Sequence, residues 1–310
     1  MKRVYFLVVI IAIGVLGIRY SSFAQKLKHE DLNKKMDSLK KANPKYTNVD
    51  ESLLIRKYYA DKRNKRIEAV KKQSFKEQKV PKPPQKKQGY SVSDTGGKNI
   101  FTAALDAQSD YEVLVELYNA LDGPNWMYGQ NENWLTGPIN TWKGVTVDAN
   151  NNVIALDLNI FFEDNRSAKY LLPTSIGTLG NLTSLSVITE QNLGQIPSTI
   201  SSLSKLEYLT LKGVSGTFPD IFNLTNLVSL EMESGQIEGG LSEEIGNLVN
   251  LEFLRLYNLQ LDGGVPSTLV NLTKLEYFTL SFNNFDSLPS NICSFPFYYI
   301  GFCSNNLDLI

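Results

Sequence analysis

Histidine and cysteine are nearly absent from this chain of 310 residues, which contains one histidine and two cysteines. His29 lies in a lysine-rich segment near the N-terminus, and both cysteines, Cys293 and Cys303, lie near the C-terminus. The residues between them therefore contain no histidine general base, no Ser–His or Cys–His pair and no histidine–cysteine metal cluster. These absences favour a binding protein over an enzyme, and we expect neither a cofactor nor a bound metal.

Positive charge is scarce in the C-terminal two thirds of the chain. Residues 91–310 contain 8 Lys+Arg and 24 Asp+Glu, whereas residues 26–90 contain 20 Lys+Arg and 8 Asp+Glu. The overall net charge of −1 hides this segregation. An acidic main body argues against nucleic acid as a partner, because phosphate binding needs a concentrated basic surface.

Long hydrophobic runs are also rare, and the main one lies at the N-terminus. Lys2 and Arg3 precede an apolar stretch over residues 4–18, which is followed by Ser22-Phe23-Ala24. This order is typical of a secretory signal peptide over residues 1–24, cleaved after Ala24. An uncleaved anchor is the alternative, but 15 residues of helix span only about 22 Å of a hydrocarbon core of roughly 30 Å. We expect a secreted, periplasmic or cell-surface protein.

The lysine-rich segment 25–98 has too thin an apolar stripe to form a packed domain. Apolar residues recur at helical spacing, as in Leu32, Met36 and Leu39, but lysine and arginine runs separate such groups. Residues 80–87 are rich in proline and lysine and favour an extended linker. We interpret the segment as a solvated, partly helical stalk. Electrostatic contact with an anionic envelope surface, or with the acidic body of the same protein, is the alternative.

Residues 99–152 carry the signals of a short helix followed by loops. Ser109-Asp110-Tyr111-Glu112 has the spacing of a capping box, and the apolar face that follows ends at Gly123-Pro124. The three tryptophans of the protein then occur among glycine, asparagine and proline, which predicts a compact plug with buried rings; they are Trp126, Trp134 and Trp142. The turn at 148–152 fits an ordinary Asp/Asn turn or a calcium loop.

Leucines recur as L-x-x-L-x-L, which is the strongest pattern in the sequence. Copies start at Leu182, Leu206, Leu227, Leu251 and Leu275, at intervals of 24, 21, 24 and 24 residues. An irregular earlier copy starts at Val153. Each repeat is too short to bury its own leucines, so neighbouring repeats must stack them into one core. The sequence therefore predicts an α/β solenoid of about six repeats over residues 153–292.

These motifs resemble leucine-rich repeat proteins of the plant-type subclass. Ile176-Gly177-Thr178-Leu179 and Ile245-Gly246-Asn247-Leu248 match the end of that repeat. The stretch 110–148, with Gly123-Pro124-Asn125-Trp126, is similar to the N-terminal cap of secreted leucine-rich repeat proteins of Bacteroidetes-type bacteria. The resemblance implies a leucine-rich repeat horseshoe with a parallel concave β-sheet and a helical, tryptophan-rich cap. It also implies a non-catalytic role in binding proteins or peptides.

Two positions depart from that subclass. Thr141 and Thr146 stand where the plant cap has a cysteine pair, which favours a bacterial protein. The inward asparagine ladder is largely missing, and the aligned positions hold Glu190, Val214, Gly235, Leu259 and Asn283. Because asparagine normally satisfies buried backbone groups at this turn, we expect less regular turns here.

The variable positions of L-x-x-L-x-L should lie on the concave face, in columns that run across the sheet. The first column is Ala155, Ser184, Tyr208, Ser229, Phe253 and Tyr277. The second column is Asp157, Ser186, Thr210, Glu231, Arg255 and Thr279. The third column is Asn159, Ile188, Lys212, Glu233, Tyr257 and Ser281. One half of this surface is small and polar, and the C-terminal half is aromatic and charged.

Exposed aromatic residues beside an arginine are typical of a recognition surface, so the concave face is the candidate ligand-binding site. Cross-strand pairing within the sheet is the alternative explanation for these aromatics. The candidate residues are Tyr208, Lys212, Glu231, Glu233, Phe253, Arg255, Tyr257, Tyr277 and Phe282. A protein ligand would use the whole strip, whereas a glycan would stack on one or two rings.

A glycosidase interpretation rests on Glu231 and Glu233 alone. Residues two apart on a strand have Cα atoms roughly 6.5 to 7 Å apart, a separation that suits the two carboxyls of such an enzyme. Side by side on an open face, however, they lack the contrasting environments that would separate their pKa values. We therefore prefer a non-catalytic protein.

Cys293 and Cys303 are expected to form a disulfide in a C-terminal cap over residues 293–310. Export permits disulfides, whereas a redox-active pair is more often C-x-x-C. The sequence as a whole thus predicts an exported, monomeric protein that binds a protein or peptide through its concave face. A glycan-binding or adhesin-like surface component, and a structural spacer without a ligand, are the alternatives.

Overall fold

The computed structural model describes residues 51–77, 109–163, 170–292, 299–302 and 304–307. The apolar N-terminal run, the proline-rich linker, Cys293 and Cys303 lie outside the described residues, so the expected signal peptide and disulfide remain predictions. Among the described residues, no helix has the length and apolar character needed to cross a membrane.

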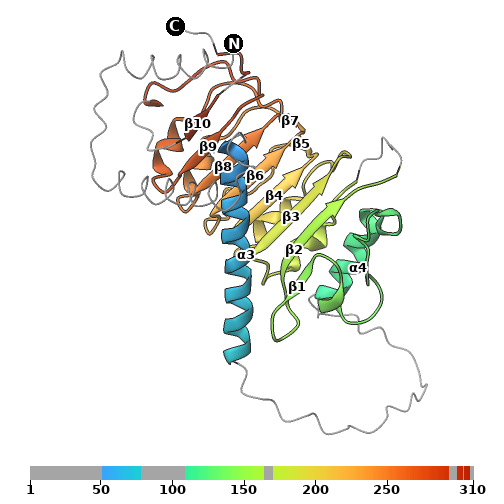
Figure 1. The fold of residues 1–310 in the computed structure, drawn as a ribbon. Coiled ribbons are helices and arrows are strands. Elements are labelled where there is room, and N and C mark those ends of the chain that lie inside the picture. The colour runs from blue at the N-terminus through green and yellow to red at the C-terminus, as the bar shows by residue number, and fades with distance from the viewer. Residues whose placement is uncertain (1–50, 78–108, 164–169, 293–298, 303, 308–310) are drawn as a thin grey trace, which may run out of the picture.

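One eight-stranded sheet runs through the molecule in the order β1-β2-β3-β4-β6-β8-β9-β10 (Figure 1). The strands are β1 (Val145–Val147), β2 (Val153–Ile160), β3 (Ser184–Thr189), β4 (Tyr208–Lys212), β6 (Ser229–Glu233), β8 (Phe253–Tyr257), β9 (Tyr277–Thr279) and β10 (Tyr299–Gly301). β1 pairs antiparallel with β2, and all later pairs are parallel. Strands β3, β4, β6, β8 and β9 each begin two residues after the first leucine of a predicted repeat, which confirms the predicted solenoid.

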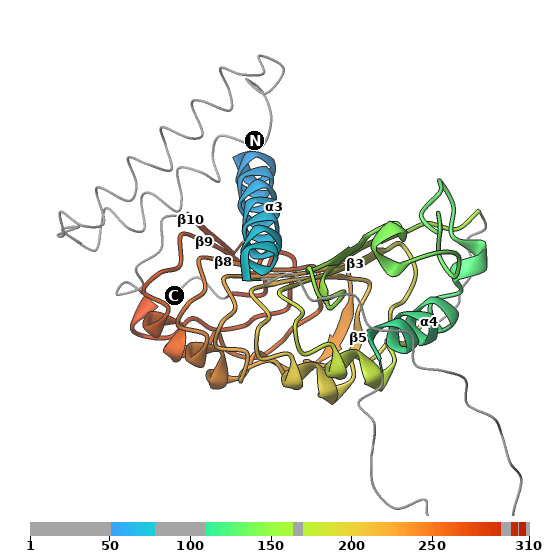
Figure 2. The same ribbon diagram turned by 90° about the horizontal axis from the view of Figure 1, so that it is seen from below.

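Short 3₁₀ helices cover the convex side of this sheet (Figure 2). They are η4 (Thr174–Thr178), η5 (Ser198–Ser202), η6 (Glu243–Asn247) and η7 (Ser267–Asn271). The repeat that starts at Leu206 is three residues shorter than its neighbours, and its tail forms turns in place of such a helix. A small second sheet pairs β5 (Ser215–Thr217) with β7 (Gln236–Glu238).

The repeat leucines form one continuous core between the sheet and the convex side. Leu185, Leu209, Leu230 and Leu254, the second leucines of four successive repeats, are all fully buried. The first leucine of each repeat is also buried, at no more than 2% exposure. At about 25 cal/mol per Å² of buried apolar surface, stacking of this kind is the main force that holds the repeats together.

A helix and an aromatic cluster close the first end of this core. Helix α4 (Asp110–Ala120) begins with the predicted capping box, in which Ser109 and Glu112 bond each other's backbone N–H. Two 3₁₀ helices follow, η2 (Gly123–Asn125) and η3 (Ile139–Thr141), and Trp126 and Trp142 come directly after them. All three rings are buried as predicted, and the Trp126 and Trp134 indoles donate to backbone carbonyls.

The turns after the strands are more regular than their residues suggest. Asn283 works as an asparagine ladder position does: its Oδ1 accepts from the backbone N–H groups of Leu259 and Leu261, and its Nδ2 donates to backbone carbonyls. At four of the five aligned turns the preceding residue has a positive φ; these residues are Gly213, Ser234, Asn258 and Phe282. Backbone hydrogen bonds to the next repeat replace the missing side chains, as from Gly213 N to the Glu233 carbonyl. The expected irregularity is therefore not seen at these four turns.

Helix α3 (Glu51–Glu77) crosses the strands on the face opposite the 3₁₀ helices (Figures 1 and 2). Its side chains contact β2, β6 and β8 and the residues just before β4, β8 and β9. The interpretation of residues 25–98 as a solvated stalk is thus wrong for residues 51–77. The alternative, contact with the acidic body of the same protein, holds for this helix because its arginines find carboxylates across the concave sheet.

Candidate functional site

The concave face has the side-chain columns predicted from strand alternation. The first column is paired in register from Ala155 through Ser184, Tyr208, Ser229 and Phe253 to Tyr277. The second is paired in the same way from Asp157 to Thr279, through Ser186, Thr210, Glu231 and Arg255. In the third column the pairs Asn159–Ile188, Lys212–Glu233 and Glu233–Tyr257 are in register. The repeat spacing therefore determines which side chains share this surface.

One face of α3 carries a series of cations that meet these columns. Arg56, Arg63 and Arg66 lie at positions i, i+7 and i+10, which place them on one side of a helix. An Nη2 of Arg56 lies 2.7 Å from Glu231 Oε1 and 3.2 Å from Glu233 Oε2. Together with the other two arginines, it spreads the helix's positive charge over the acidic sheet.

The contacts of Arg63 and Arg66 extend the series toward β2. Arg63 Nη2 lies 3.1 Å from Asp157 Oδ2. Arg66 makes a fork-shaped pair with Glu207, with Nε and Nη2 each 2.8 Å from a carboxylate oxygen. This hydrogen-bonded pair with the Glu207 carboxylate raises the pKa of Arg66 above its usual value. Lys62 pairs with Glu252, the residue before β8.

Tyr59 is the aromatic anchor of α3. Its ring packs against Phe253 at a centroid distance of 4.8 Å, and only 4% of the residue is exposed. Its phenol oxygen lies 2.9 Å from Glu276 Oε2 and 3.1 Å from the Glu252 carbonyl. Burial, followed by the nearby Glu276 carboxylate, raises the pKa of Tyr59 far above its usual value. The phenol is thus held protonated where α3 meets the aromatic half of the sheet.

A charged cluster lies on the sheet under the N-terminal part of α3. Arg255 lies 3.2 Å from both Glu231 and Glu233, and its guanidinium stacks 4.1 Å from the centre of the Tyr257 ring. Burial raises the pKa of Glu231, and the charges of Arg56 and Arg255 partly offset this effect. Because Arg56 also pairs with both glutamates, the cluster balances two carboxylates with two guanidinium groups.

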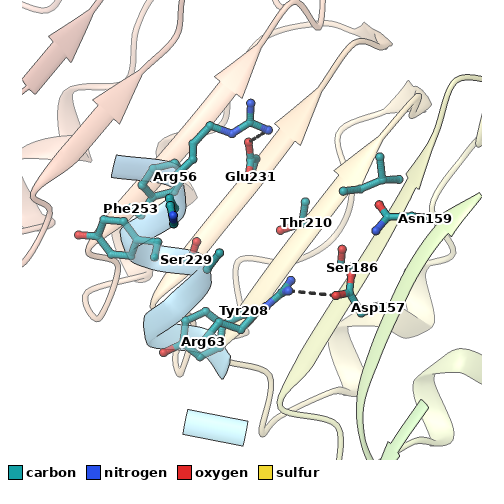
Figure 3. A pocket seen from close by; sticks show the side chains of 14 residues that line it. Arg56, Arg63, Asp157, Asn159, Ser186, Tyr208, Thr210, Ser229, Glu231 and Phe253 are labelled. Atoms are coloured by element: carbon teal, nitrogen blue, oxygen red, sulfur yellow. Dashed lines mark hydrogen bonds and ion pairs between the residues drawn. The ribbon is translucent and has the colours of Figure 1, made fainter. Parts of the chain in front are cut away.

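A cavity of about 380 Å³ remains between α3 and the small, polar half of the sheet (Figure 3). Arg56, Tyr59 and Arg63 from the helix line it, and small residues such as Ser186 and Thr210 face them from the sheet. The Ser186 hydroxyl is buried there without a hydrogen-bond partner among the described residues. The helix therefore fits closely over Phe253 and leaves space where the column residues are short.

The candidate residues chosen from the sequence do come together, but several of them are not open to solvent as expected. Four of them are buried, at 1 to 7% exposure; these are Tyr208, Phe253, Arg255 and Tyr277. Phe253 and Tyr277 stack on each other, so the cross-strand pairing considered as the alternative does occur. The expectation of exposed aromatics is thus wrong for Tyr208, Phe253 and Tyr277.

Three other candidates lie at one edge of the face. Phe282 is 47% exposed and packs against Tyr257. Lys212 lies 2.6 Å from Glu190 and borders a separate shallow cavity formed by the turns after the strands. These residues remain accessible beside α3.

Sequence reasoning missed the residues of α3 itself. In the sequence they are only part of a basic segment; these residues are Arg56, Tyr59, Arg63 and Arg66. Their spacing of three, seven and ten residues from Arg56 places them on one side of a helix. This spacing indicates a contact surface only when the acidic columns of the sheet are known to lie opposite.

Neither metal binding nor glycosidase chemistry gains support at the sites considered. The Asp148 carboxylate accepts from the backbone N–H groups of Asn150 and Asn152, as an ordinary turn residue does. No group of three or more histidine, cysteine, aspartate or glutamate residues in the described ranges is arranged to hold a metal ion. Glu231 and Glu233 share the same two arginines, so both are held in ion pairs.

Comparison with solved structures shows the fold. A plant ice-binding protein superposes with a TM-score of 0.52 at 22% sequence identity, over 64% of this chain and 71% of that one. The leucine-rich repeat ectodomain of the receptor kinase GASSHO1/SCHENGEN3 from Arabidopsis thaliana gives a TM-score of 0.51 at 25% identity. That match covers 62% of this chain and 24% of the ectodomain, so this chain spans about a quarter of its length. No family model matches the chain, and no curated protein does. The fold is a leucine-rich repeat solenoid like that of plant ectodomains.

Proposed function

We propose that this protein is an exported, non-catalytic leucine-rich repeat module that binds a protein or peptide segment on its concave face. The observation that carries the proposal is the docking of α3, because it places a peptide segment on this face through both an aromatic anchor and ion pairs. A surface with these contacts accepts a polypeptide segment of complementary charge.

Two further observations support the proposal. The Arabidopsis ectodomain of similar fold was solved in complex with CASPARIAN STRIP INTEGRITY FACTOR 2. Residues 1–24 have the sequence of an export signal, which would place the module outside the cytoplasm. Both observations suit a receptor-like or surface-displayed binding protein.

The test is selection from a displayed peptide library on the full chain, beside the double variant Asp157→Asn/Glu207→Gln, which removes two carboxylates that hold the arginines of α3. The matched control is Asp262→Asn/Glu238→Gln, which makes the same charge change outside the strands of the concave sheet. We expect peptides that bind the wild type and the control but lose at least tenfold in affinity for the Asp157/Glu207 variant, with circular dichroism showing all three folded. Failure to recover peptides, or equal binding to every variant, contradicts the proposal; a glycan-array signal in that case favours a glycan-binding component.

A further inference from the structure

Helix α3 is held on the concave face in a different way from helix α4. Helix α4 buries an apolar face made of Val113, Leu114, Leu117 and Tyr118. Over residues 55–73 of α3, Ile55 and Tyr59 are the buried side chains, and four cations on this helix form ion pairs with carboxylates of the body. Polar contacts of this kind exchange readily, since water and other charged segments offer the same interactions.

The fit of α3 to the sheet is also incomplete. The cavity of about 380 Å³ lies beneath residues 56–63, where Ala60 presents only a methyl group. Arg63 Nε and Ser186 Oγ are buried there without hydrogen bonds among the described residues. A helix with a larger polar side chain at this level would make contacts that α3 does not make.

The tether sets how strongly α3 competes with another segment. Residues 78–108 join it to the N-terminus of α4. Because α3 is covalently attached, it competes at a fixed effective concentration, which is on the order of millimolar for a short flexible linker. A free helix that makes the same contacts as α3 must therefore reach about that concentration to replace it, whereas a helix that also fills the cavity needs less.

We infer that α3 is an exchangeable occupant of the concave site, and that the site's ligand is a basic helix of another protein that repeats the α3 pattern. The pattern is an arginine, a tyrosine three residues later, and arginines seven and ten residues after the first, as in Arg56, Tyr59, Arg63 and Arg66. This inference rests on the proposed function and names its partner class. Charge complementarity carries it, because the opposing positions on the sheet are Glu231, Asp157 and Glu207.

The experiment uses a fluorescent synthetic peptide of residues 51–77 as the probe and titrates the full chain against it. The variant Arg63→Glu/Arg66→Glu releases the chain's own α3 and leaves the sheet unchanged. Its matched control is Lys65→Glu/Lys72→Glu, which makes the same charge change at exposed lysines for which the described residues show no ion pair. Hydrogen exchange over residues 55–73 reports whether α3 is docked, and exchange in β4 reports whether the solenoid is folded.

We expect half-saturation of the peptide at a protein concentration near millimolar for the wild type and the control, and binding about ten- to a hundredfold tighter for the releasing variant. Adding Asp157→Asn and Glu207→Gln to that variant should remove the gain. Equal affinity for wild type and releasing variant, with exchange showing α3 released, overturns the inference; the peptide-library result still decides the proposed function separately. A full-chain dimer in light scattering that exchanges α3 between copies also overturns it, because the occupant is then a second copy.

Discussion

Tyr59 combines the burial of an aromatic anchor with a polar end that must stay protonated. Its phenol faces Glu276 and the Glu252 carbonyl, with Tyr58 beside it and Lys62 Nζ 5.8 Å from its ring centre. The carboxylates and the burial act in the same direction on the pKa, and both effects disappear when α3 leaves the sheet.

We expect the Tyr59 phenol to resist ionisation above pH 10 for as long as α3 is docked. Since the docked pKa is raised, the contribution of Tyr59 to docking is complete below pH 10 and is lost as the pH rises above it. The measurement is phenolate absorbance of the wild type minus that of Tyr59→Phe, compared with the same difference in an Arg63→Glu/Arg66→Glu background. A wild-type Tyr59 that titrates near pH 10 with α3 docked would show that the phenol is not buried as described.

Asn283 supplies a second prediction at this scale, about stability. Asn283→Ala leaves two buried backbone N–H groups without an acceptor, so we expect the free energy of unfolding to fall by about 2 to 4 kcal/mol. Asn284→Ala is the control, because that exposed side chain makes a single bond to the Gln260 carbonyl and should cost under about 1 kcal/mol. Urea unfolding of both variants checks the difference, and equal losses would contradict the assigned role.

At the scale of elements, the stacking of 3₁₀ helices depends on glycines that allow close approach. A Cβ on Gly177 would lie 2.3 Å from the Thr199 carbonyl oxygen, so η4 and η5 would have to separate. Gly177→Ala should therefore destabilise the solenoid by about 1 to 3 kcal/mol. Gly180→Ala, whose Cβ would come no closer than 3.9 Å to Thr178 O, should have an effect within about 0.5 kcal/mol. Thermal unfolding of the two variants distinguishes them, and similar stabilities would argue against close packing at Gly177.

The strands, the leucine core and the concave columns were predictable because each follows from a local period. A repeat of about 24 residues with alternation inside each strand is enough to place Tyr208, Ser229 and Phe253 in one column. The role of α3 was not predictable in this way, because two buried apolar residues among arginines look like a solvated helix. Its partners Asp157 and Glu276 lie 94 residues from Arg63 and 217 residues from Tyr59, respectively, in the chain.

At the scale of the whole molecule, the segregation of charge seen in the sequence becomes an internal interface. The basic helix covers an acidic sheet, so opposite charges that are far apart along the chain are close in space. Four cations of α3, on Arg56, Lys62, Arg63 and Arg66, are thereby paired with carboxylates of the acidic body.

Docking of α3 should weaken as salt is added. The screening length falls from about 10 Å at 0.1 M to about 3 Å at 1 M, so partly exposed ion pairs such as Arg66–Glu207 lose most of their strength. Hydrogen exchange over residues 55–73 should therefore speed up at high salt, while exchange in the apolar-packed α4 should not. Equal responses of the two helices would mean that α3 is held by apolar packing instead.

The position of α3 in the chain sets an order for folding. The helix is synthesised before the sheet it contacts, and its partners range from Asp157 in β2 to Glu276 just before β9. Closing contacts of such long sequence separation is slow and follows the formation of local repeats. The full set of α3 contacts can thus form only when the repeats of the nascent chain have stacked as far as β9. The helix is synthesised before the repeats but docks after them.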